Sequence, residues 1–225
     1  MSAPYYTDDL VTLHLGDSLE EIAWTAADVL VTDPPYGIGW RRSANPARSS
    51  RAHAGIMGDA DTTARDAAVA LMASKPAVVF GSLYAPFPAP LTQVLIWRKP
   101  PDAGVVGSTT GFRRDVEAVF LVGPWPRRDA RWSSVLISGI RNIGTPNSPA
   151  GRTGHPHAKP MDLMETILDA CPPGVIADPF AGSGSTLVAA RNLGRRAIGV
   201  ECHEPYAEVI AKRLAQSVLD LGSIA

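Results

Sequence analysis

Short apolar runs alternate with amphipathic segments along most of this chain. The apolar runs are rich in β-branched and aliphatic residues, as buried strands are, and they lie at 11–15, 28–32, 77–80, 93–97, 175–177 and 197–200. The amphipathic segments predict helices, and they lie at 62–74, 162–170, 184–193 and 205–219. Strands that alternate with helices indicate a largely parallel sheet covered on both faces, so we expect an α/β fold.

Three stretches depart from this alternation. Ser18 and Glu21 have the spacing of a capping box, which predicts a short helix that ends near Ala27. The apolar runs at 116–122 and 134–137 are suited to an antiparallel hairpin. Residues 37–61 show no persistent period, and a compact domain rarely carries so long a loop without a functional reason.

Length and composition are those of one globular domain. The chain has 225 residues, of which 45% are hydrophobic and 19% charged, and no linker-like stretch divides it, so we expect a single domain over 1–225. No apolar run reaches the roughly 18 residues of a membrane span, and the acidic N-terminus lacks the basic start of a secretory signal. We therefore expect a cytoplasmic protein without a membrane partner. Cys171 and Cys202 are expected to be reduced core thiols.

Charge is unevenly distributed although the formal net charge is only −1. Residues 1–40 hold seven acids and no Lys or Arg, whereas 41–52 hold four arginines and no acid. A second Arg-rich stretch follows at 113–152. This segregation is compatible with a basic face for phosphates and equally with a set of solvated surface arginines.

The tetrapeptide Asp33-Pro34-Pro35-Tyr36 follows directly on the predicted strand at 28–32. The prolines fix φ and carry no N–H, so the chain after Asp33 is stiff and its carbonyls are free to accept hydrogen bonds. Tyr36 presents an aromatic ring beside these acceptors. A planar substrate with an amino group suits such a site, and a nucleobase is such a substrate.

A second motif, the glycine-rich turn at 178–186, lies between a predicted strand and a predicted helix. Such a turn lets a ligand approach the backbone closely. Ser185 stands where a phosphate-binding loop needs a lysine, and Leu187 where a dinucleotide fingerprint has its third glycine. Glu201 follows the next strand, about twenty residues on, where a carboxylate can accept both hydroxyls of a ribose. This spacing predicts an adenosine-bearing cofactor without a 2′-phosphate.

These motifs together resemble the amino-methyltransferase group of DNA methyltransferases, which use S-adenosyl-L-methionine. Asp33 to Tyr36 match the family's DPPY-type tetrapeptide, Phe180 to Gly184 its FxGxG turn, and Glu201 its ribose-binding acid. The tetrapeptide precedes the cofactor turn, an order that resembles the beta subclass. The resemblance implies a single Rossmann-like methyltransferase domain with permuted motif order, a largely parallel central sheet and an antiparallel hairpin.

The resemblance also implies the site residues. Asp17 is similar to the acid that contacts the cofactor's adenine, and Lys159 and Pro160 to an element near its methionine carboxylate. Catalysis is assigned to Asp33, Pro34, Pro35 and Tyr36. Cofactor binding is assigned to a larger set of residues: Asp17, Asp33, Lys159, Pro160, Asp178, Phe180, Gly182, Ser183, Gly184, Ser185, Thr186 and Glu201. His155 and His157 have no third ligand at suitable spacing, so no metal is expected.

The implied reaction moves the sulfonium methyl group onto an exocyclic amino nitrogen of a flipped DNA base. The acid at position 33 favours adenine N6, while cytosine N4 remains the alternative. An RNA or protein amino-methyltransferase and a non-catalytic DNA-binding relative are the other readings. DNA contacts are expected from the loop at 37–61 and from a short target-recognition region at 123–154. Homodimerisation and a place in restriction-modification are compatible with the family.

Overall fold

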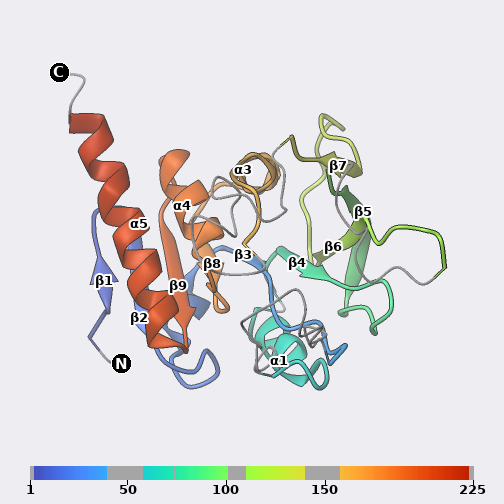
Figure 1. Ribbon diagram of the computed structural model, residues 1–225, viewed down its shortest axis with the longest axis horizontal. Helices are drawn as coiled ribbons and strands as arrows, with labels where there is room; N and C mark the ends of the chain where they lie inside the picture. Colours follow the sequence, from blue (N-terminus) through green and yellow to red (C-terminus); the bar gives the residue numbers. More distant parts are fainter. Residues whose placement is uncertain (1–2, 40–57, 73, 101–109, 140–157, 223–225) are drawn as a thin grey trace, which may run out of the picture.

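A nine-stranded mixed sheet runs through the computed structural model of the chain (Figure 1), with strand order β1-β2-β9-β8-β3-β4-β6-β5-β7. The structure describes residues 3–39, 58–72, 74–100, 110–139 and 158–222, without the side chains of 217–222. The strands are β1 (Tyr6–Thr7), β2 (Val11–Leu15), β3 (Val29–Thr32), β4 (Ala77–Gly81), β5 (Leu91–Arg98), β6 (Val116–Val122), β7 (Val135–Ile137), β8 (Ile176–Asp178) and β9 (Ala197–Glu201). The predicted α/β class is confirmed.

Five neighbouring strands, β2, β9, β8, β3 and β4, are parallel. Next to them, β6 runs antiparallel to both β4 and β5. The predicted hairpin between 116–122 and 134–137 is wrong, because β7 pairs in parallel with β5 instead. Both edges of β6 are already occupied by β4 and β5, so only the outer edge of β5 is open to β7.

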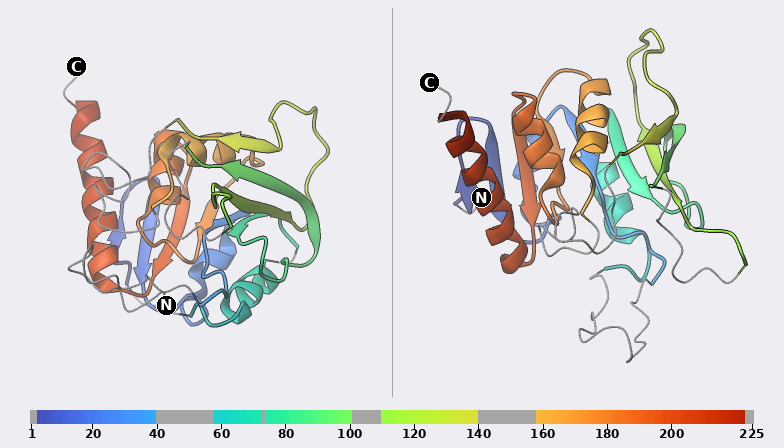
Figure 2. Two further views of the ribbon diagram at one scale, coloured as in Figure 1. Left: turned by 45° about the vertical axis from the view of Figure 1, so that its right-hand side comes forward. Right: turned by 45° about the horizontal axis from the view of Figure 1, so that its top comes forward.

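Helices cover both faces of the sheet (Figures 1 and 2). One face packs against α3 (Met161–Ala170), α4 (Ser185–Asn192) and α5 (Glu204–Gly222), and their apolar side chains form one core with Val31 and Phe80. The other face packs against α1 (Thr63–Leu71) and the 3-10 helix η1 (Ile22–Ala26), and this second core contains Trp24 and Val79. The result is the three-layered arrangement that a parallel sheet requires.

The short helix predicted after β2 is confirmed, because η1 ends at Ala26 with Ala27 as its C-cap. It has no side-chain cap, however, so the capping box of Ser18 and Glu21 is wrong. Asp17 takes the turn-forming role, since its side chain accepts from the backbone N–H of Leu19 at 2.8 Å and its carbonyl accepts from Glu21 at 2.8 Å. Trp24 then anchors η1, being fully buried with its indole N–H donated to the Ser18 carbonyl at 2.8 Å.

The two central strands β3 and β8 lie side by side at the point where the chain changes direction across the sheet. After β8 the chain continues to β9 on one side, and after β3 it continues to β4 on the other. This is a topological switch point, where open α/β sheets place their ligands. A buried hydrogen bond of 2.8 Å from the Thr32 hydroxyl to Asp178 joins the two strand ends. Burial raises the pKa of Asp178 to about 6.

The two cysteines, both expected in the core, differ in burial. Cys171 is buried, which confirms its placement in the core, whereas Cys202 is exposed just beyond β9, so its placement there is wrong. Within the described ranges, no helix is long and apolar enough to cross a membrane.

The anchoring of η1 can be tested by comparing two of its residues. Trp24→Ala should lower the free energy of unfolding by about 3–5 kcal/mol, because it removes a fully buried aromatic side chain. Ile22→Ala in the same turn is the matched control, since Ile22 is 49% exposed and should cost well under half as much. Urea unfolding midpoints measure both, and equal losses would contradict the anchoring role.

Asp178 should make stability depend on pH. Its pKa in the folded protein, about 6, exceeds the ordinary 3.8, so the folded state favours the protonated acid and loses stability as the pH rises between these values. Asp178→Asn removes this loss, and its stability relative to the wild type should rise by roughly 2–2.5 kcal/mol from about pH 4 to about pH 7. Urea unfolding across this range measures the difference, and the exposed Glu208→Gln serves as control. A pH-independent difference for Asp178→Asn would contradict the burial of an ionised acid.

Candidate active site

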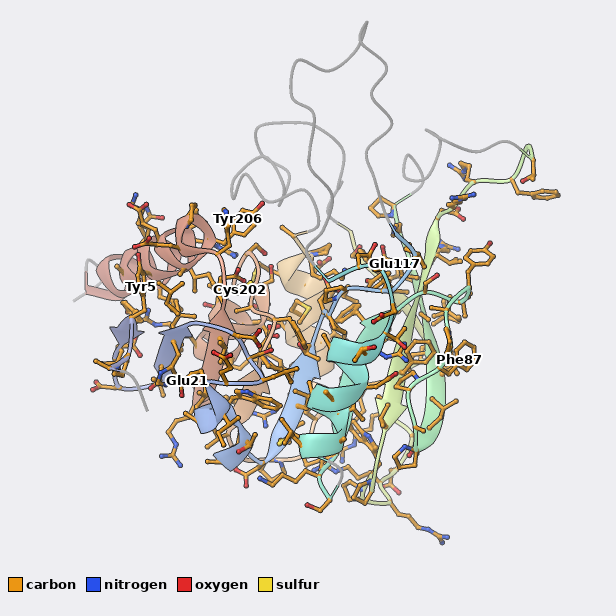
Figure 3. The ribbon with its side chains drawn as sticks, turned by 90° about the horizontal axis from the view of Figure 1, so that it is seen from below. Tyr5, Glu21, Phe87, Glu117, Cys202 and Tyr206 are labelled. Carbon is orange, nitrogen blue, oxygen red and sulfur yellow. The ribbon has the colours of Figure 1, made fainter. Side chains whose placement is uncertain are left out.

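The two sequence motifs meet at the carboxyl edge of the parallel strands. Asp33 follows β3, the glycine turn follows β8, and Glu201 ends β9. Glu117 joins them from β6, where it lies beside the end of β4 because its neighbour Ala118 pairs with Gly81. Figure 3 shows Glu117 and Cys202 across this end of the sheet, with Tyr206 beyond them.

The tetrapeptide forms a compact polar turn. The Tyr36 hydroxyl donates to Asp33 Oδ1 at 2.9 Å, and Pro34 is buried beneath them. Gly37 then bends the chain with φ of 70°, and a Cβ at this position would lie 2.7 Å from the backbone carbon of Asp61. The stiff turn predicted from the prolines is therefore held at both ends.

Lys159 lies at the centre of the site. Its ammonium group is 2.7 Å from Asp33 Oδ2 and 3.3 Å from Glu117 Oε2, and its side chain is 8% exposed. It also lies over the Phe80 ring, 4.8 Å from the ring centroid. A buried cation needs such partners, because an unpaired one would be strongly destabilising. The structure thus brings Lys159 into direct contact with Asp33, the predicted catalytic acid.

Glu117 and Lys99 are site residues that the sequence did not identify. Lys99 Nζ lies 2.5 Å from Glu117 Oε1, and Glu117 Oε2 accepts from the Tyr36 hydroxyl at 3.1 Å. Burial alone would raise the pKa of Glu117, but the ammonium groups of Lys159 and Lys99 lower it to about 2. The sequence did contain one signal for Glu117, which is an acid within the otherwise apolar run at 116–122.

The same cluster fixes the charge states of its other members. Burial and the carboxylates of Asp33 and Glu117 raise the pKa of Tyr36 well above its usual value, so its phenol stays neutral. Burial works against the charged form of Lys159, but the two carboxylates outweigh it and raise the pKa of the ammonium group. The site therefore holds two cations, Lys99 and Lys159, against two carboxylates.

The glycine turn adopts conformations that require glycine. Gly182 and Gly184 have φ of 53° and 76°, and a Cβ on Gly184 would lie 2.9 Å from the Ile210 side chain. The buried Ser185 donates to the backbone carbonyl of Lys159 at 3.0 Å, so the turn and the polar cluster are directly connected. The Ser183 hydroxyl lies 3.1 Å from that of Ser185. The turn is therefore tightly packed: Gly184 is buried and Gly182 is half-buried.

Glu201 is held in one orientation by backbone donors. Its Oε2 accepts from the Gly182 N–H at 2.7 Å and its Oε1 from the His203 N–H at 2.8 Å. Burial raises the pKa of Glu201, and these N–H groups partly oppose the shift. Asp17 lies near the same edge of the sheet, because the N–H of the preceding residue, Gly16, donates to the Glu201 carbonyl at 3.0 Å. Its side chain is exposed. Phe180 is partly buried against the core on the η1 side.

Asp178 and Thr186 lie beneath the turn and not on its surface. Asp178 is 2% exposed, and it accepts from Thr32, from the Phe180 N–H and from Thr186. Thr186 is 4% exposed. In this structure both residues support the turn, and their predicted contact with a cofactor stays a prediction. Pro160 is also buried, at the start of α3.

The predicted DNA-contacting regions are only partly described. Residues 40–57 of the first loop, 140–154 of the second region, and His155 and His157 lie outside the described residues. Within 123–139, Arg128 lines a pocket with Cys171 and Arg196, which precede β8 and β9. That is the amino edge of the parallel strands. Figure 2 (right) shows the 123–134 loop projecting at the end of the molecule opposite to the chain after β3.

Two curated relatives share parts of the chain. The type II methyltransferase M.ScaI of Streptomyces caespitosus is 42% identical over 73 residues, which are 32% of this chain and 24% of the relative. The type II methyltransferase M.HinfI of Haemophilus influenzae is 37% identical over 87 residues, which are 38% of this chain and 23% of the relative. The chain thus matches about a quarter of each relative's length.

Solved structures show the same fold over nearly the whole chain. The cytosine-N4-specific PvuII DNA methyltransferase superimposes with a TM-score of 0.66 at 17% identity, covering 93% of this chain and 88% of that one. The crystal structure of the M1.HpyAVI–SAM complex superimposes with a TM-score of 0.59 at 20% identity, covering 91% and 99%. A family model described as DNA methylase matches residues 96–213, more than half of the chain. On this match, the chain belongs to the DNA methylase family.

Proposed function

We propose that this protein transfers a methyl group from S-adenosyl-L-methionine to an exocyclic amino nitrogen of DNA. The observation that carries the proposal is the meeting of a fixed acceptor, Asp33, with a glycine turn and a ribose-type acid, Glu201, at one switch point. Membership of the DNA methylase family and the type II methyltransferases among the relatives support it.

The chain's own residues fit the cofactor. Gly182 and Gly184 hold the turn in a left-handed conformation that glycine adopts readily, and the N-terminus of the following helix α4 is suited to an anion such as a carboxylate. Glu201 keeps lone pairs for the ribose hydroxyls, and Asp17 can accept from the adenine amino group. When bound, the cofactor supplies a sulfonium methyl group.

Asp33 is assigned to the amino group of the target base. That nitrogen is a poor nucleophile, because its lone pair is delocalised into the ring. Hydrogen bonds to the Asp33 carboxylate and the Pro34 carbonyl favour a tetrahedral nitrogen whose lone pair is free to attack. As the new N–C bond forms and the S–C bond breaks, the nitrogen gives up one proton, which an Asp33 oxygen accepts. No covalent enzyme intermediate is needed.

The target base must leave the duplex to reach Asp33, which costs a few kcal/mol. Stacking on Tyr36, whose ring is held in place by its hydroxyl, offsets part of that cost. The acid at position 33 favours adenine N6 as the target over cytosine N4. Residues 37–61 lie next to the tetrapeptide in sequence, and we assign them the DNA contacts nearest to the flipped base. We further propose a single domain whose target-recognition region lies within 123–154; its loop at 123–134 lies at the opposite, amino edge of the sheet from Asp33, so contacts nearest to the flipped base do not come from that loop.

Loss of Asp33 should abolish methyl transfer while cofactor binding largely survives, because Asp33 is one of many residues assigned to the cofactor. Asp33→Ala is expected to reduce transfer of labelled methyl to mixed-sequence DNA by at least about 1,000-fold, since it removes the acceptor of the amino group. Calorimetric titration with S-adenosyl-L-methionine should give a dissociation constant within about threefold of the wild type. Exposed Glu208→Gln is the control and should change neither value.

Two results would contradict this proposal. Wild-type protein that labels RNA or protein but no DNA would overturn the substrate. An Asp33→Ala variant that is folded and as active as the wild type would overturn the assignment of the acceptor.

Replacement of Glu201 should have the opposite effect to loss of Asp33: it should weaken cofactor binding and leave the rate at saturating cofactor nearly unchanged. Glu201→Gln replaces a carboxylate held by the Gly182 and His203 N–H groups, and we expect cofactor affinity to fall by roughly 10-fold, because hydrogen bonds to a charged acceptor are worth about 1.5–3 kcal/mol. At saturating cofactor, methyl transfer should recover to near the wild-type rate. Unchanged affinity with a lowered saturated rate would place Glu201 outside the cofactor site.

A further inference from the structure

Asp33 is already engaged on both oxygens before any substrate arrives. Lys159 donates to Oδ2 at 2.7 Å, and the Tyr36 hydroxyl donates to Oδ1 at 2.9 Å. A target amino group must therefore compete with a cation and a phenol for this acceptor. An ammonium group in contact also withdraws electron density from the carboxylate, which weakens it as an acceptor for a neutral amino group.

Both donors have a second acceptor within reach, and it is the same carboxylate. Glu117 Oε2 lies 3.3 Å from Lys159 Nζ and 3.1 Å from the Tyr36 hydroxyl. The Tyr36 hydroxyl has a single proton, so it serves Asp33 or Glu117 but not both at once. Transfer of the two donors from Asp33 to Glu117 needs only small side-chain rotations and leaves neither of them unpaired.

We propose that Glu117 is a positioning residue that takes over Lys159 and Tyr36 when the target amino group binds Asp33. This inference rests on the proposed amino-methyltransferase function and assigns that site a further residue. Glu117 does not touch the substrate; it acts by releasing the oxygens of Asp33.

The structure holds Glu117 ready for this role. It lies on β6, where it pairs with Trp97 of β5 and where its neighbour Ala118 pairs with Gly81 of β4, so its backbone is fixed by the sheet. Lys99 binds its other oxygen, Oε1, at 2.5 Å, which orients Oε2 toward Lys159 and Tyr36. The low pKa of Glu117, about 2, keeps it ionised throughout the physiological range.

A purely structural role would have a different signature. If Glu117 only filled space, its replacement would affect the rate equally with or without Lys159. If Glu117 draws Lys159 off Asp33, its loss leaves Asp33 as the remaining carboxylate partner of Lys159 among the described residues, and the damage depends on that lysine being present. A double-mutant cycle separates the two cases.

The experiment measures kcat for methyl transfer to DNA at saturating cofactor in four proteins: wild type, Glu117→Gln, Lys159→Met and the double variant. We expect Glu117→Gln to lower kcat by roughly 10- to 100-fold in the wild-type background and by less than about threefold in the Lys159→Met background. The dissociation constant for S-adenosyl-L-methionine should change little with Glu117→Gln. Unfolding midpoints check that each variant is folded.

Glu117→Asp keeps the proposal testable if Lys159→Met does not fold. It retains the carboxylate, so it should recover most of the activity that Glu117→Gln loses. The proposal is overturned if Glu117→Gln matches the wild type, if its effect is the same in both backgrounds, or if Glu117→Asp is as impaired as Glu117→Gln. A wild type that methylates no DNA marks the failure of the proposed function itself, and this inference fails with it.

Discussion

The ion pair between Lys159 and Asp33 is the interaction on which the rest of the site depends. It joins residues 126 positions apart, at 2.7 Å, with the lysine almost fully buried. A buried ammonium group cannot stay unpaired, and one cation between two carboxylates leaves a negative charge to be balanced. Lys99, directly after β5, balances it, and the single proton of the Tyr36 hydroxyl goes to Asp33 or to Glu117. The geometry of Asp33, the proposed acceptor, is thus set by charge pairing across three segments of the fold.

The sheet topology makes this pairing possible. Parallel strands deliver Asp33, the glycine turn and Glu201 to one edge, and the switch between β3 and β8 separates the loops that follow them. Ser185 connects the turn to the backbone of Lys159, so the proposed cofactor site and the polar cluster share a structural element. A change in the position of α4 would therefore alter both the proposed cofactor site and the polar cluster.

What the sequence could predict follows from the same topology. Three features could be placed together from the sequence alone, because each follows a predicted strand of the parallel sheet. They are Asp33 to Tyr36, the glycine turn and Glu201. Glu117 was not identified because it lies on an antiparallel strand, and its place next to the Ala118–Gly81 pair depends on register, which no local pattern reveals. The hairpin was wrong for a related reason, since pairing depends on which strand edge is free. The capping box failed because Asp17 competed for the same turn.

The central claim is that methyl transfer occurs at an exocyclic amino nitrogen held by Asp33. The most direct test is mass spectrometry of nucleosides from unmethylated genomic DNA after incubation with the wild-type protein and methyl-deuterated S-adenosyl-L-methionine. The account predicts deuterated N6-methyladenine; N4-methylcytosine would keep the mechanism and change the base. Label on a ring carbon, as in 5-methylcytosine, or no labelled nucleoside would contradict the account.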